Sequence, residues 1–156
     1  MDDLRAALSV EMQTLQAAVD AFDEAAAGVL GVNRTDLRCL EILVREEAAA
    51  PSALGLALGL TTGSVTAMLD RLEKLGYLTR SPDPSDRRKV AVRATDAVRQ
   101  KAWELYGPFV AEGEELTRDY SAEQLRLLAD FLRRSRELYD HQLARVRELP
   151  VVKRRR

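Results

Sequence analysis

The stretch from Leu60 to Thr95 restricts the fold more than any other part of the sequence. Halfway along it, the spacing of the apolar residues changes from that of a helix to the alternation of a β-strand. Its first half is a helical pattern, with Thr61 as a typical N-cap and Gly76 as a stop. The helical stripe consists of Val65, Met68, Leu69, Leu72 and Leu75. Two short runs, YLTR and KVAVR, then flank the loop SPDPSD. The prolines of this loop stand where no backbone N–H is needed for a hydrogen bond between strands. The stretch therefore predicts a helix followed directly by a β-hairpin.

Helical patterns also precede this stretch. Apolar residues at spacings of three and four predict a helix over about residues 4–30, with Gly31 as its stop. Thr35 is the expected N-cap of a second helix, which is apolar over more than one face and should be central. A short third helix is expected to begin near Ser52.

Two long helices are expected after the hairpin. Thr95 should cap the first, in which the pair Gly107-Pro108 predicts a kink or a break. Ser121 and Gln124 form a capping-box pattern for the second. The complete order predicts a mainly α chain with a two-stranded β-wing. That is the layout of a winged helix-turn-helix, whose second motif helix enters a DNA major groove.

Charge is unevenly distributed along the chain. The net charge is −1, yet residues 52–95 hold seven cations and four anions, so the middle of the chain is positive between acidic flanks. Three of these cations, Arg87, Arg88 and Lys89, meet at the tip of the expected hairpin, where they repel one another. This cluster suits phosphate binding or insertion into a narrow minor groove. The alternative is a solvated charged turn.

The helix over residues 61–75 presents a small, polar face at its start. Such a face suits a close approach to bases and phosphates, and the helix dipole adds positive charge at that end. Ser64 and Thr66 are candidates for hydrogen bonds to DNA, and Ala67 for contact with a thymine methyl. The candidate DNA contacts on this helix are Thr62, Ser64, Thr66, Ala67, Arg71 and Lys74. The alternative is that this face is merely solvated.

These motifs resemble the DNA-binding lobe of the MarR family of bacterial transcriptional regulators. The family joins a DRLEKxG helix end to a wing of the form Asp-x-Arg, five residues, Leu-Thr. This chain has Asp70-Arg71-Leu72-Glu73-Lys74 with Gly76, then Asp86-x-Arg88 and Ala94-Thr95. The resemblance covers about residues 52–95 closely and the flanking helices by order and length.

The resemblance implies a cytoplasmic, dimeric regulator of double-stranded DNA. A homodimer formed by the N- and C-terminal helices would read a palindromic site, and repression is the family's commoner mode. The implied domains are a dimerisation helix over 1–34, a winged lobe over 35–95, dimerisation helices over 96–149 and a basic tail over 150–156, expected to be disordered. The rival hypothesis is a winged-helix module that binds a protein.

Three positions depart from the family pattern. Ala94 replaces the usual leucine of the wing, Ala67 stands where relatives often carry a long polar residue, and Gly55 replaces an alanine. The early exposed turns of the helix carry no Arg, Asn or Gln, so few bidentate hydrogen bonds to base edges are expected. Specificity is therefore expected to depend on the wing arginines and DNA shape.

Relatives of this kind often release DNA when a small aromatic or anionic compound binds beside the dimer helices. The resemblance makes Trp103, Tyr106 and Phe109 candidate ligand contacts, although an ordinary core or interface aromatic is the preferred interpretation of each one alone. One branch of the family senses peroxide through a single cysteine, which leaves Cys39 as a redox alternative. Because Cys39 lies within an apolar helix, a buried and inert thiol is the preferred interpretation.

Other classes of function find little support in the residues. The single His141 and the single Cys39 give no zinc site of the usual spacing, and no cofactor is expected. The sequence has no phosphate-binding glycine loop and no paired nucleophile and base, so the chain is not expected to be an enzyme. The N-terminus lacks a basic signal-peptide region, and no apolar stretch reaches the length of a membrane span. A cytoplasmic protein is expected.

Overall fold

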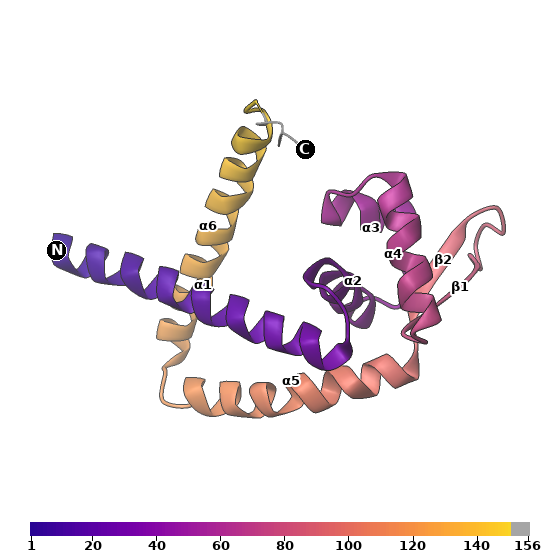
Figure 1. Cartoon of the computed structure of the whole chain (residues 1–156). Helices are drawn as coiled ribbons and strands as arrows, with labels where there is room; N and C mark the ends of the chain where they lie inside the picture. The colour runs from indigo at the N-terminus through magenta and orange to yellow at the C-terminus, as the bar shows by residue number, and fades with distance from the viewer. Residues whose placement is uncertain (151–156) are drawn as a thin grey trace. The chain divides into compact units, whose positions relative to one another are not determined.

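The structure, a computed structural model, describes residues 1–150 (Figure 1). Its elements in chain order are α1 (Asp2–Leu30), α2 (Arg34–Arg45), α3 (Pro51–Leu58), α4 (Thr62–Lys74), β1 (Leu78–Pro82), β2 (Val90–Ala94), α5 (Asp96–Thr117) and α6 (Ala122–Arg147). The expected mainly α fold with a two-stranded wing is therefore confirmed. Residues 151–156 of the predicted basic tail lie outside the described residues.

The chain divides into two compact units, Met1–Pro108 and the residues from Phe109 onward. We call residues 34–94, from α2 to β2, the winged lobe, and α1, α5 and α6 the arms. A kink or a break was expected at Gly107-Pro108; helix α5 is continuous across this pair, so the helix does not break there. A proline removes only one backbone donor, and helical residues on both sides continue the helix. Among residues 1–150, no single helix is both long and apolar enough to span a membrane; α3 and α4 meet that test only together, bent by 109°.

Most helix ends lie where the sequence places them. Gly31 ends α1 in the left-handed region, with φ of 68°, and Thr61 caps α4 by accepting from the Ser64 backbone. The capping box of Ser121 and Gln124 is present in full. Thr35 as the cap of α2 is wrong: the cap is Asn33, whose Oδ1 accepts from the Asp36 N–H at 2.9 Å. Asn33 is extended, whereas Thr35 is already helical.

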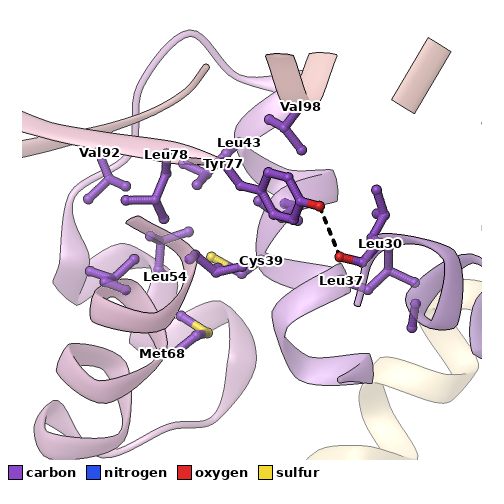
Figure 2. Close-up of a cluster of buried hydrophobic side chains, with 14 of the residues drawn as sticks. Leu30, Leu37, Cys39, Leu43, Leu54, Met68, Tyr77, Leu78, Val92 and Val98 are labelled. Carbon is purple, nitrogen blue, oxygen red and sulfur yellow. Dashed lines mark hydrogen bonds between the residues drawn. The ribbon is translucent and has the colours of Figure 1, made fainter. Parts of the chain in front are cut away.

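The core of the winged lobe is formed by buried side chains from each of its helices and strands (Figure 2). Leu43, Leu72 and Val92 have no exposed surface, and the last turn of α1 adds Leu30. The Tyr77 hydroxyl donates to the Leu30 carbonyl oxygen at 2.9 Å, so the start of the wing is tied to α1. The predicted stripe of α4 is buried at Val65, Met68, Leu69 and Leu72.

Leu75 was expected on that stripe and is instead 48 % exposed. Leu75 is the C-cap of α4, and its N–H still donates to the Arg71 carbonyl oxygen at 3.1 Å. The helix ends here because Gly76 turns the chain at a φ of 74°, which leaves the Leu75 side chain at the exposed end of the stripe. The wing itself is antiparallel, with Leu78 opposite Ala94 and Pro82 opposite Val90.

Gly55 is explained by close packing of α3 on α4. A Cβ at this position would lie 3.0 Å from Val65 Cγ2 and 3.4 Å from the Leu60 carbonyl oxygen. An alanine would therefore push against a buried side chain of the helix expected to face DNA. The departure from the family pattern lets the two helices of the motif approach closely.

Candidate nucleic-acid interface

The exposed face of α4 begins with a turn of small hydroxyl residues. Thr62, Ser64, Thr66 and Ala67 are all exposed, as the stripe requires. The Thr61 and Ser64 hydroxyls lie 2.9 Å apart, and the Thr66 hydroxyl donates to the Thr62 carbonyl oxygen at 3.1 Å. The Thr66 proton and one proton of the Thr61–Ser64 pair are thus engaged locally, while the second proton of that pair and oxygen lone pairs remain on the surface. Lys74 is exposed at the far end of the helix.

Arg71 is held by the buried carboxylate of Asp36 on α2. Arg71 Nη2 donates to Asp36 Oδ1 at 2.7 Å and Nε to Oδ2 at 3.2 Å, while Nη1 donates to the Ala67 carbonyl oxygen at 3.3 Å. The Asp36 side chain is 3 % exposed and that of Arg71 is 52 % exposed. The hydrogen bonds to Asp36, and then its negative charge, raise the pKa of Arg71. The guanidinium fixes α4 on α2, and two of its five N–H groups remain for a phosphate.

A hollow of about 540 Å³ lies where the start of α2 meets this face of α4. It is lined by Asn33, Arg34, Thr35, Leu60, Ser64, Ala67, Met68 and Arg71. Residues 33–35 were not predicted to lie beside the start of α4, because they precede it by more than 25 residues in the sequence and no local pattern links them to it.

The wing tip is shaped by its own acids. Asp83 Oδ1 accepts from the Ser85 hydroxyl at 2.6 Å and from the Ser85 and Asp86 N–H groups at 2.8 and 3.2 Å, which lowers the pKa of Asp83. Asp86 Oδ1 accepts from the Arg88 N–H at 3.1 Å. Asp86 therefore holds the loop through the backbone of an arginine rather than its guanidinium.

The tip cations Arg87, Arg88 and Lys89 are all exposed. Lys89 lies 3.8 Å from Asp86, and no ion pair joins Arg87 or Arg88 to an acid within residues 1–150. The carboxylates of the tip thus organise the backbone and leave both guanidinium groups available at the surface. Such an arrangement is suited to binding phosphates.

The three aromatic candidates are in different surroundings. Tyr106 is half-buried: its ring meets Phe22 edge-on at 5.4 Å, and its hydroxyl donates to Glu41 Oε1 at 3.4 Å. Burial and the charge of Glu41 raise the pKa of Tyr106 to about 12. Trp103 is 70 % exposed and lies against the backbone of Gly107, and Phe109 is 65 % exposed in the second unit.

Cys39 is fully buried in the core of the winged lobe. Burial, with a smaller effect of Asp36, raises the pKa of its thiol from 9.0 to about 12. A thiol in this state is protonated and inaccessible, which does not favour a redox-sensing role.

Comparison with known proteins agrees with this geometry. The sequence model of the MarR family matches residues 32–90. A chain described as an uncharacterized HTH-type transcriptional regulator, YcgE of Bacillus subtilis (strain 168), is 37 % identical over 127 residues, which are 81 % of this chain and 82 % of the relative. The chain belongs to the MarR family.

The chain also resembles solved structures in fold. The YusO protein from Bacillus subtilis superposes with a TM-score of 0.61 at 20 % identity, over 88 % of this chain and 97 % of the other. Wild-type MarR from Escherichia coli in its apo form superposes with a TM-score of 0.56 at 24 % identity, over 82 % of this chain and 95 % of the other. The MarR-family chain is a DNA-binding transcriptional regulator, as its sequence predicted, and not an enzyme.

Proposed function

We propose that this MarR-family chain is a cytoplasmic repressor that binds a palindromic DNA site as a homodimer and is released by a small molecule. The observation that carries the proposal is the pair of exposed surfaces on the winged lobe. The start of α4 is small and polar, and the wing tip carries Arg87 and Arg88 outside any ion pair within the described chain. One duplex is contacted by both surfaces.

The dimer is supported by the arms. Helix α6 has 26 residues and none is buried, although it carries a large apolar side chain on most turns. Its exposed apolar residues are Leu125, Leu127, Leu128, Leu132, Leu138, Tyr139, Leu143 and Val146. Helix α1 likewise exposes Leu4, Leu8, Leu15 and Val19. A second copy of the chain is the partner we propose for these faces, and the two-fold symmetry makes the DNA site a palindrome.

Within the proposed complex, the contacts divide into two kinds. Thr62, Ser64, Thr66 and Ala67 approach base edges, and Arg71 and Lys74 bind phosphates beside them. Arg87, Arg88 and Lys89 bind phosphates of the flanking minor groove, where a narrow groove strengthens the attraction. Specificity then depends on DNA shape at the flanks as much as on the bases read by α4.

Release is proposed to involve a small aromatic or anionic effector near Tyr106. This residue joins α1 and α2 through Phe22 and Glu41, so a ligand that displaces its ring would disturb the helix that holds Arg71. Trp103 and Phe109 are further contacts in this proposal, in keeping with their exposure.

The test is selection of bound sequences from a random duplex pool, followed by titration of the selected duplex at several salt concentrations. We expect a palindrome with half-sites about one helical turn, ~34–36 Å, apart. Neutralising Arg87, Arg88 and Lys89 with alanine should lower the log–log salt slope of the dimer by about five, because each of the two chains loses three phosphate contacts and each lost contact removes ~0.9.

The matched control removes three exposed cations of α6, Arg126, Arg134 and Arg136, and should leave the slope unchanged. Arg88→Ala alone should relax the preference for A·T-rich flanks. If no sequence is enriched at moderate salt, the protein-binding alternative is favoured instead. If the tip variant retains its slope, the wing does not contact DNA.

A further inference from the structure

Arg80 occupies an unusual position on the wing. Opposite residues of an antiparallel pair share a face, and Arg80 lies opposite Val92, which is fully buried. Two residues earlier on the same face, Leu78 is 1 % exposed in the core. A cation on the inner face of a hairpin, at the edge of its core, requires a partner.

The partners of Arg80 are two carboxylates on the last turns of α4. Arg80 Nη2 donates to Asp70 Oδ1 at 2.7 Å, and Nε donates to Glu73 Oε2 at 3.1 Å. The guanidinium thus bridges two successive turns of the helix. This bridge raises the pKa of Arg80 and lowers that of Glu73, in both cases chiefly through their hydrogen bond.

Val92, which lies opposite Arg80 on the other strand of the hairpin, is also held in place. Val92 exchanges backbone hydrogen bonds with Ala49, at 3.0 Å from Ala49 N to Val92 O and 2.9 Å in the reverse direction. The hairpin is therefore attached at Val92 to the segment before α3 and at Arg80 to α4. The tip with Arg87 to Lys89 extends beyond these two residues, so a small rotation there displaces the tip cations.

We propose that Arg80 is a positioning residue for DNA binding, which sets the wing at the angle on α4 that lets the tip cations and α4 reach one duplex together. The proposal rests on the DNA contacts proposed above for the tip. Arg80 itself touches Asp70 and Glu73, and it acts on DNA through Arg87, Arg88 and Lys89.

The test is a double-mutant cycle between Arg80→Ala and the tip variant, in which Arg87, Arg88 and Lys89 are alanines. In the wild-type background, Arg80→Ala should weaken binding to the selected duplex about tenfold and reduce the salt slope, because coupled residues lose shared contacts. In the tip-variant background, Arg80→Ala should change neither. Arg80→Lys should restore only part of the affinity, since one ammonium cannot bridge both carboxylates.

A second variant separates positioning from simple electrostatics. Glu73→Gln removes a negative charge near DNA and so strengthens binding if charge alone matters. The proposal expects weaker binding, because the charged hydrogen bond that holds Arg80 against Glu73 is replaced by a weaker neutral one. The matched control is Arg133→Ala: Arg133 on α6 is also held by two acids, Asp130 and Glu137, and its loss should leave affinity unchanged.

Every outcome bears on the proposal. Equal losses from Arg80→Ala in both backgrounds overturn it, since Arg80 then acts independently of the tip. Tighter binding by Glu73→Gln also overturns it. A tip variant that binds like the wild type instead contradicts the proposed DNA contacts, and is recognised before Arg80 is tested. Melting temperatures of all variants should stay within a few degrees of the wild type, as expected for exposed ion pairs.

Discussion

The winged lobe and the arms both contain amphipathic helices, but they differ in whether the apolar face is buried within the chain. Helix α4 buries four of its thirteen residues within its own lobe, whereas α6 buries none of twenty-six. Leu72 is fully buried and Leu132 is 61 % exposed, although both are leucines of amphipathic helices. The difference indicates that the lobe holds its core within one chain, whereas the arms carry faces suited to a second.

The largest effect expected from this comparison is on thiol protection. At pH 9 the thiol of Cys39 should resist a maleimide reagent until the lobe unfolds globally, a protection equivalent to about 5–15 kcal/mol. The raised pKa gives a stabilisation that is complete below pH 9, the ordinary value, and is lost as pH rises through about 12.

The control for this measurement is a cysteine placed on an arm. Leu132→Cys in a Cys39→Ala background should be labelled rapidly in dilute protein and be protected as the concentration rises. Rapid labelling of Cys39 in the folded chain would show that the core of the lobe opens locally, and would remove the contrast between lobe and arm.

Truncating one leucine in each region should produce the next largest difference. Leu72→Ala should lower the free energy of unfolding by about 2–5 kcal/mol at every protein concentration, because it leaves a cavity in the core. Leu132→Ala should cost less than about 0.5 kcal/mol where the chain is monomeric. Chemical denaturation at several protein concentrations measures both. A concentration-independent loss of several kcal/mol for Leu132→Ala would contradict the assignment of α6 to an arm.

A pair of glycines gives the smallest expected effect. A Cβ added at Gly113 of α5 would meet no neighbouring side chain within 4 Å, so Gly113→Ala should stabilise the chain by about 0.5–1 kcal/mol. Gly55→Ala should not stabilise the chain, because the added Cβ would lie 3.0 Å from Val65 Cγ2. The free-energy cost of this overpacking offsets the gain in helix propensity. Thermal denaturation of the two variants beside the wild type measures both. Equal stabilisation by both changes would mean that the lobe is no more tightly packed than the arm.

The fold was largely predictable because its signals are local. The stripe of α4, the stops at Gly31 and Gly76, and the alternating runs of the wing each depend on residues within one or two turns. The cap of α2 was wrong because Asn33 and Thr35 are both good N-caps, and only the extended backbone at Asn33 decides between them.

The candidate site was predictable only in part. The helical wheel identifies Arg71 as exposed, but its pairing with Asp36 spans 35 residues and follows no local rule. The bridge from Arg80 to Glu73 depends in the same way on how the wing packs against α4. Sequence patterns therefore nominated the candidate surface, and the packing of distant elements determines which of its charges are already paired within the chain.

The most direct test of the account is the mass of the chain in solution, alone and on DNA. Sedimentation equilibrium should give twice the chain mass of 17.4 kDa without DNA, and two chains on each duplex that carries both half-sites. A species that remains at 17.4 kDa across the concentration range, or a saturated complex with one chain per duplex, would contradict the account.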